Sequence, residues 1–428
     1  MNKAGEPGGG VRLRDVPASA GQETPGAFPG KGNTWIPSLW AWIVCPIVFW
    51  FSYVPILNFY ARGVLAAFLA WFFWAATIGR RRLILPALPL WFIFWSLFAL
   101  AVGLLASDMN SALRKWLTIF SVGLVSWAVA NAVVWSRSAR PWAWAYMFAA
   151  VVAYLSNYMP LGDYLVSEYS TEVLDRYVGT LGNANTFGRS MVQGFFIGLA
   201  LLHFNSRGRE ALCAILVMGV LGLATIESSS RTAMLGLGIG VLTFYTSIRV
   251  RDLITPLNIM GLASVVVGIV TVFAYFPKHF FTSIERMTIF FSFLGITPKV
   301  QTKERSIDHR VELANRAFEV WQEYPLGVGL DNFRNFVGTY AHSNYLEILV
   351  STGVLGLLIY YGPFLNFYAN EFVRSRSADG KPWFMYCVGS LVAVLVMDLF
   401  NVSYYSKTFW LFLGVFSGLT ALRHKMMN

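Results

Sequence analysis

Charged residues are scarce in this sequence of 428 amino acids, of which only 13% are Asp, Glu, Lys or Arg. A soluble domain usually carries about 25% charged residues, so this deficit excludes an ordinary soluble fold. Apolar residues take their place: 56% of the chain is hydrophobic, 16% is aromatic, and the mean hydropathy is +0.55. The composition predicts a protein that crosses a membrane many times, with belts of Trp and Tyr at the two interfaces.

Cysteine is rare as well. Cys45, Cys213 and Cys387 lie inside apolar runs without the paired spacing of a disulfide framework or a zinc site, and we interpret them as packing residues. The segments expected on the outer side of the membrane lack a nucleotide-binding loop, a zinc signature and an Asp-x-Asp pair. The residues therefore predict no metal and no cofactor.

Cations exceed anions, giving a formal net charge of +11. Such an excess can indicate a nucleic-acid partner, but these cations lie in short loops between apolar runs, where they set topology. The basic groups that fall on one side are Arg80-Arg81-Arg82, Arg137 with Arg140, Arg207 with Arg209, Arg249 with Arg251, Arg374 with Arg376, and Arg423 with Lys425. By the positive-inside rule that side is cytoplasmic, which puts both termini inside and predicts no nucleic-acid partner.

About twelve apolar runs are long enough to cross roughly 30 Å of hydrocarbon. Their approximate spans are 37–57, 62–79, 87–106, 115–134, 141–159, 187–205, 211–227, 232–248, 254–276, 343–368, 383–400 and 406–422. Residues 1–33 are rich in Gly, Pro, Ala and charge and predict a disordered cytoplasmic tail without a cleavable signal. The predicted fold is an all-α polytopic membrane protein, with its transmembrane domain over residues 34–428.

Two long loops are expected on the outer side, over about residues 160–186 and 277–341. In a Gram-negative cell that side of the inner membrane is the periplasm. The second loop contains an amphipathic helix from about Arg305 to Tyr324. The apolar residues that share its predicted buried face are Val311, Ala314, Ala317, Phe318 and Trp321, while Glu312, Arg316 and Glu319 point away from it.

Arg310 shares the predicted buried face of this helix. A desolvated guanidinium needs an anionic partner, and that partner is either a structural carboxylate or an anionic ligand. Arg231, at the end of Glu227-Ser228-Ser229-Ser230-Arg231, presents a similar choice. It either snorkels to the interface or forms an anion pocket with the serine hydroxyls.

Gly182-Asn183-Ala184-Asn185-Thr186 opens the span at 187–205, whose helix N-terminus faces outward. Such a terminus favours anions, and Arg189 adds positive charge there. Helix capping alone explains the asparagines equally well.

His342 lies where the long outer loop turns into the span at 343–368. A titratable group at that boundary suits proton transfer near neutral pH, although a structural hydrogen bond is the simpler interpretation of one histidine. Glu347 lies about 140° around the helix from it and is not its natural partner.

Four motifs in this order resemble the O-antigen ligase/polymerase superfamily of bacterial inner-membrane glycosyltransferases. His342-Ser343, nine residues and Gly353-Val354-Leu355-Gly356 match the family's signature, with Leu357 in place of its last glycine. The other three motifs are Gly182-Asn183-Ala184-Asn185, Ser228-Ser229-Ser230-Arg231-Thr232, and Arg310 leading through Tyr324-Pro325-Leu326-Gly327-Val328-Gly329 to Phe333. The likeness covers about residues 179–356.

The resemblance implies a glycan donor on undecaprenyl diphosphate and, for a ligase, an acceptor hydroxyl on a lipid A–core sugar. It implies a metal-independent, inverting transfer without a cofactor, in the inner membrane with the site facing the periplasm. His342 would be the general base, and Arg231, Arg310 and Arg189 would bind the diphosphate. Asn183, Asn185 and Ser343 would support them. The expected partners are thus the lipid-linked donor, the lipid A–core acceptor and membrane lipids.

Other functions fit parts of the sequence. An O-antigen polymerase would use the same donor with another lipid-linked glycan as acceptor, and a protein O-oligosaccharyltransferase would use a Ser or Thr on a protein. A transporter of lipid-linked glycans fits the composition, but the chain has no internal repeat and no charge ladder at mid-depth. The sugar, the donor chain length and the oligomeric state are not encoded in any motif we recognise.

Overall fold

A computed structural model describes residues 42–49, 53, 58–79, 81–84, 87–158, 179–181, 183–204, 208–246, 305–374 and 381–427. These residues form helices and connecting turns, and none of them is in a strand. The predicted tail at 1–33, the predicted span at 254–276, most of the predicted outer loop at 160–186 and residues 277–304 of the second predicted outer loop lie outside the described residues.

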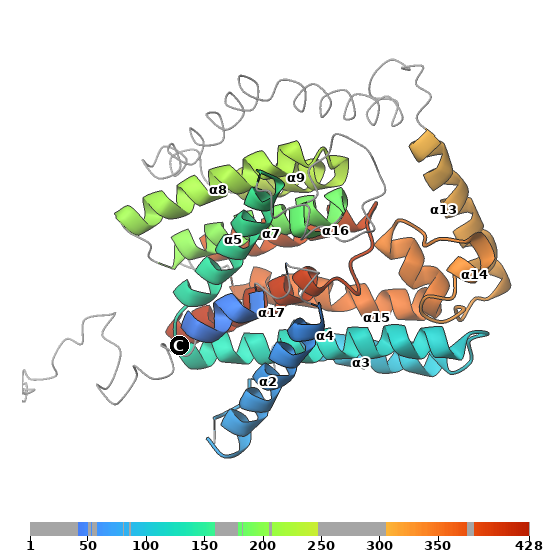
Figure 1. Ribbon diagram of the computed structural model, residues 1–428, viewed down its shortest axis with the longest axis horizontal. Coiled ribbons are helices and arrows are strands. Elements are labelled where there is room, and N and C mark those ends of the chain that lie inside the picture. Colours follow the sequence, from blue (N-terminus) through green and yellow to red (C-terminus); the bar gives the residue numbers. More distant parts are fainter. Residues whose placement is uncertain are drawn as a thin grey trace, which may run out of the picture.

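Helices account for nearly every apolar run in the described part of the chain (Figure 1). Their bounds are α2 Asn58–Thr77, α3 Ala87–Gly103, α4 Met109–Ser136, α5 Arg140–Leu155, α7 Ala184–His203, α8 Arg209–Glu227, α9 Arg231–Thr246, α13 Arg305–Glu323, α14 Arg334–Val337, α15 Asn344–Arg374, α16 Lys381–Asp398 and α17 Lys407–Met427. Short 3₁₀ turns, η2 and η3, cover Ser156–Tyr158 and Gly179–Leu181. Residues 42–49 are also helical.

Each predicted span from 62 to 248 and from 343 to 422 overlaps one observed helix, so the helical prediction is confirmed there. Among the described helices, α4, α8 and α15 are long and apolar enough to cross a membrane. Parts of α2, α3, α9 and α16 form shorter apolar helices. The number of twelve membrane crossings stays a prediction.

Small residues let pairs of helices approach closely. A Cβ added to Gly414 of α17 would lie 2.6 Å from the carbonyl oxygen of Ser126 in α4, and one added to Gly240 of α9 would lie 2.8 Å from that of Gly389 in α16. Lipid is as apolar as the side chains that it replaces, so packing of this kind, rather than the hydrophobic effect, holds membrane helices together. Large buried rings, including Trp95, fill the rest of the bundle.

α15 is broken in its N-terminal third. Gly353 has φ 66° and ψ −176°, a region of backbone space that is essentially reserved for glycine. The break leaves carbonyl groups of the preceding turn without helical donors. The N–H groups of Val328 and Gly329 fill this role by donating to the carbonyls of Val350 at 2.8 Å and Ser351 at 3.0 Å. The turn after α13 is therefore held on the broken helix.

α13 confirms the predicted amphipathic helix, but its buried face differs from the predicted one. Ala317 is buried together with Leu313 and Val320, whereas Val311 and Phe318 are 41% and 45% exposed. Val311 and Phe318 lie about 100–120° around the helix axis from Ala317. The turn at Val328 and α15 cover a narrower face of α13 than this, so these two side chains are left exposed. Glu312, Arg316 and Glu319 are exposed, as predicted.

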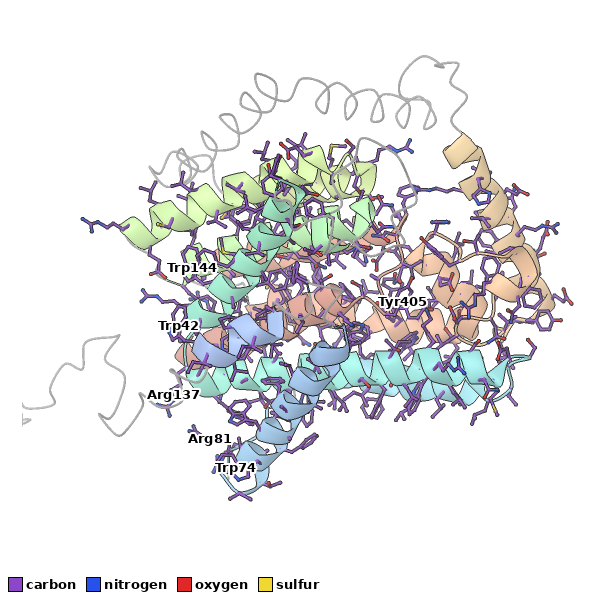
Figure 2. The ribbon with its side chains drawn as sticks, viewed as in Figure 1. Trp42, Trp74, Arg81, Arg137, Trp144 and Tyr405 are labelled. Atoms are coloured by element: carbon purple, nitrogen blue, oxygen red, sulfur yellow. The ribbon has the colours of Figure 1, made fainter. Side chains whose placement is uncertain are left out.

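Figure 1 places α13, α14 and the start of α15 at one end of the bundle and the C-terminus at the opposite end. Arg137 lies toward the C-terminal end and Tyr405 toward the other, as Figure 2 shows. The end that carries α13 is therefore the one opposite the predicted cytoplasmic cations. We refer to it as the α13 end.

Candidate functional site

His342 lies in a strained turn between the loop and α15. Its φ of 55° is rare for a residue with a side chain, and such strain is found preferentially at functional sites. Two contacts hold the turn: the Glu347 carboxylate accepts the Ala341 N–H at 2.8 Å, and the Ser343 carbonyl accepts the Glu347 N–H at 2.9 Å. Glu347 thus bonds to the backbone beside His342, which agrees with its predicted exclusion as a partner of the imidazole.

The surroundings of His342 favour its neutral form. Its ring is half-buried and lies against the ring of Tyr340, with centroids 4.1 Å apart. Burial, then the positive charges of Arg310 and His309 on α13, lower the pKa of His342 to about 4. At neutral pH the imidazole therefore carries a lone pair that can accept a proton.

Arg310 is half-buried on α13, and α13 packs against α15. Its positive charge is the second cause of the low pKa of His342. The turn from Tyr324 to Gly329, which follows α13, is bonded to α15 just beyond His342. Two motifs that are separate in sequence thus form one structural unit.

The side chain of Asn344, two residues after His342, makes four hydrogen bonds. Its side-chain nitrogen donates to the Tyr361 hydroxyl at 2.8 Å and to Asp398 at 3.1 Å, and its oxygen accepts the N–H groups of Ser403 and Tyr404 at 2.9 and 3.0 Å. These bonds use the full capacity of an amide. They fix the start of α15 to the end of α16 and to the loop that precedes α17.

Arg189 belongs to the same network. Its Nη2 donates to Asp398 at 3.1 Å and to the carbonyls of Met397 and Asn401, both at 3.3 Å, and both charged side chains are almost fully buried. The predicted diphosphate-binding arginine is thus paired with a carboxylate from its own chain. Its Nη1 has no hydrogen-bond partner among the described atoms, so binding of an anion by Arg189 stays a prediction.

Asn183, Asn185 and Arg231 gather where α7 and α9 begin. Asn183 caps α7, and its side chain accepts the N–H groups of Asn185 and Thr186 at 2.9 and 3.2 Å. The capping interpretation is therefore confirmed for Asn183. Asn185 accepts the Ser230 hydroxyl at 2.9 Å, and Arg231, the next residue, is half-buried at the first position of α9.

The predicted residues therefore form two groups, joined through a buried ion pair. One group contains His342, Ser343 and Arg310, and the other contains Asn183, Asn185 and Arg231. Arg189 stands between them, because it lies on α7 with the second group and bonds Asp398, which Asn344 bonds from the first. Within the described residues, no cluster of three or more His, Cys, Asp or Glu side chains is placed to hold a metal ion.

Two features of the site were not predicted. Asn344 follows the signature His342-Ser343 directly, but a buried asparagine cannot be told from a capping residue without its partners. Lys115 of α4 lies 3.2 Å from Asp331, and its ammonium is 4.1 Å from the centre of the Tyr405 ring. The only available signal for Lys115 was a cation at the predicted outer end of an apolar run.

Of the comparisons with known proteins, one gives a match to a family model. No curated protein matches the chain. Residues 214–361, about a third of the chain, match the family model described as O-Antigen ligase. The matched segment contains Arg231, Arg310, His342 and Ser343, while Arg189, Asn183 and Asn185 precede it. The match supports the resemblance predicted from the motifs: residues 214–361 of this chain are similar to the O-antigen ligase family.

Proposed function

We propose that this protein is an O-antigen ligase of the bacterial inner membrane. It transfers a glycan from undecaprenyl diphosphate to a hydroxyl group of a lipid A–core sugar, and its site faces the periplasm. The observation that carries the proposal is the strained turn of His342 directly before α15, against which α13 packs with Arg310. The family match supports the general class of ligase or polymerase chemistry.

The proposed reaction is a single displacement. The acceptor oxygen attacks the anomeric carbon, its proton passes to the imidazole of His342, and the bond from that carbon to the diphosphate oxygen breaks. The bonding electron pair leaves with the diphosphate, and the new glycosidic bond has the inverted configuration. A correctly placed general base contributes about 10²–10⁴-fold to such a rate.

Arg310 and Arg231 neutralise the leaving diphosphate in this proposal, so that guanidinium groups act where other enzymes use a metal ion. The planar fork of arginine can bind two phosphate oxygens at once, and fixed positive charge at a leaving group lowers the barrier. Binding of the anionic donor also offsets the positive charge of Arg310. That change makes His342 a stronger base when the donor is in place.

The buried network positions these groups. Asn344 fixes the backbone two residues after His342, and the pair Arg189–Asp398 fixes Asn344 against α7. We therefore assign to Arg189 a positioning role in addition to any contact with the donor. Ser343, Asn183 and Asn185 hold the two turns in which His342 and Arg231 lie.

A transfer assay with purified protein in detergent tests the function. Undecaprenyl diphosphate-linked glycan is supplied with rough lipopolysaccharide, with a second lipid-linked glycan, or with a serine-containing peptide. We expect transfer to the lipopolysaccharide alone, with unchanged rates in the presence of a chelator. Transfer to the lipid-linked glycan would instead identify a polymerase, and transfer to the peptide a protein glycosyltransferase.

A further inference from the structure

An apolar groove lies on the side of the bundle, away from His342. It encloses a cavity of about 210 Å³ between α5 and the segment that contains Trp42, Pro46 and Tyr53. Among the described residues, no charged side chain lines it. Figure 2 shows Trp42 and Trp144, which both line the groove, at the same end of the bundle as Arg137.

The sequence of α5 explains why the groove exists. Ala145, Ala149 and Ala153 follow one another at intervals of four residues, so they form one stripe along the helix. Their small side chains make a floor between larger residues such as Trp144 and Phe148. The lining on α5 runs from Pro141 to Ala153, which corresponds to about 18 Å of helix. That is more than half of the roughly 30 Å hydrocarbon thickness of a bilayer.

Two polar groups of the lining have hydrogen-bond partners within the protein. The Thr180 hydroxyl of η3 donates to the Tyr53 carbonyl, and the Trp144 N–H donates to Glu210 at 3.3 Å. The remaining lining offers alanine, proline, valine and aromatic surface. The occupant that this lining fits is an uncharged hydrocarbon chain.

The end of the groove at Thr180 lies near the start of α7, because η3 packs against α7. Thr180 lies three residues before Asn183, the cap of α7. At the end of α5, the Tyr158 hydroxyl donates to Glu227 at 2.7 Å, directly before the turn that carries Arg231. A lipid whose chain lies in the groove therefore has its headgroup next to the arginine that we assign to the diphosphate.

We propose that this groove holds the membrane-embedded isoprenoid chain of the lipid-linked donor. The inference rests on the proposed function, because it assigns the groove to the same donor. Surrounding lipid is as apolar as the groove, so the groove acts through close packing rather than through the hydrophobic effect. It fixes the path of the chain and thereby the position of the diphosphate.

Filling the groove tests this assignment. Ala149→Phe places a ring on the groove floor, and Ala67→Phe makes the same change at an exposed position of α2 that does not line the groove. Each variant is assayed with the undecaprenyl donor and with a donor that carries the same glycan diphosphate on a short prenyl group. We expect Ala149→Phe to raise KM for the long-chain donor about tenfold, equivalent to about 1.4 kcal/mol, and to leave KM for the short-chain donor unchanged. Ala67→Phe should change neither.

Binding of undecaprenyl phosphate, measured by native mass spectrometry against phosphatidylglycerol, separates the groove from the reaction. We expect Ala149→Phe to lose the undecaprenyl phosphate adduct that the parent protein and Ala67→Phe retain, even if no transfer is detected. Unchanged binding in Ala149→Phe overturns the groove assignment, and so does preferential retention of phosphatidylglycerol by the parent protein. Absence of transfer combined with groove-dependent binding would instead count against the proposed function alone.

Discussion

Histidines at the two ends of the bundle have opposite surroundings. At the C-terminal end, Nε2 of His424 lies 3.1 and 3.2 Å from the two carboxylate oxygens of buried Glu371, which also bonds Arg374 at 2.9 Å. At the α13 end, His342 lies near two cationic positions, and the closest acid in sequence, Glu347, bonds the backbone instead. One histidine is bound to a carboxylate, and the other is placed among cations.

We interpret the contact of His424 as structural and propose His342 as the reactive histidine. Glu371 and His424 join α15 to α17 and offer no reason to move a proton. Burial, then the positive charge of Arg310, disfavours the protonated form of His342, so its neutral imidazole has a lone pair that can accept a proton. The comparison predicts that changes at the α13 end affect the reaction, while matched changes at the C-terminal end affect only stability or nothing.

The largest expected effect is that of His342→Ala. Loss of the general base should lower kcat by about 10²–10⁴-fold, with little change in donor binding or in the amount of folded protein. His424→Ala is the matched control and should keep nearly full activity. The measurement is the rate of glycan transfer by each purified variant. Equal activities of the two variants would remove the distinction between the two ends.

Asp398→Asn should cause the next largest effect, on stability. It leaves the buried guanidinium of Arg189 without its counter-ion, which costs about 3–5 kcal/mol. Glu371→Gln is the comparison at the other end. Its partner Arg374 is 58% exposed, so the loss of that ion pair should cost at most about 1 kcal/mol.

Denaturant unfolding in detergent, followed by tryptophan fluorescence, measures both changes. Rescue of Asp398→Asn by a second change, Arg189→Met, would support the buried charge as the cause, since the unpaired cation is then removed. A larger loss of stability in Glu371→Gln than in Asp398→Asn would reverse the expected order.

Gly353→Ala comes third. The φ of 66° and ψ of −176° are strained for alanine, at a cost of about 1–3 kcal/mol, and the new Cβ would meet the carbonyl oxygen of Pro325. Gly362→Ala in the same helix has open space around its Cβ and should be neutral or stabilising by about 0.5–1 kcal/mol. Thermal unfolding of the two variants tests this difference. Because the turn near Pro325 follows α13, activity should also fall in Gly353→Ala.

Local patterns predicted the elements of the fold. Apolar runs gave the positions of the described helices, and helical spacing gave α13 and the exposed Glu312, Arg316 and Glu319. Both signals are local, because they depend only on residues within one helix. The exposure of Val311 and Phe318 was missed because the width of a buried face depends on the partner, here the turn at Val328.

The site was predictable in part. The motifs named His342 and Arg310, which the fold brings together, but they could not assign Arg189 to its partner. That partner, Asp398, lies more than 200 residues away in sequence, and no spacing rule connects two such positions. The same limit applies to Asn344, whose four hydrogen bonds join segments that only the tertiary structure brings together.

The smallest expected effect is on the pH dependence of kcat/KM. It tests whether the charge of Arg310 lowers the pKa of His342. Burial is the first cause of the low pKa of His342, and Arg310 is the second. The acid limb of kcat/KM, which reports the free enzyme, should therefore fall as the pH drops through about 4. Arg310→Gln should move this limb to higher pH, because the protonated imidazole is penalised less.

Stability should follow the same group with a defined sign. The ordinary pKa of about 6.5 applies to His342 in the unfolded chain, so between pH 6.5 and about 4 the unfolded state binds more protons than the folded one. Unfolding therefore becomes easier as the pH falls through that window, and this contribution should be smaller in Arg310→Gln.

Arg310→Lys separates the effect of the charge of Arg310 from the effect of its geometry. It keeps the cation and should leave the acid limb in place, yet it loses the bidentate fork and should transfer glycan more slowly. Parent-like rates in Arg310→Lys would reduce Arg310 to a source of charge, whereas an acid limb that does not move in Arg310→Gln would leave burial and His309 as the origins of the low pKa.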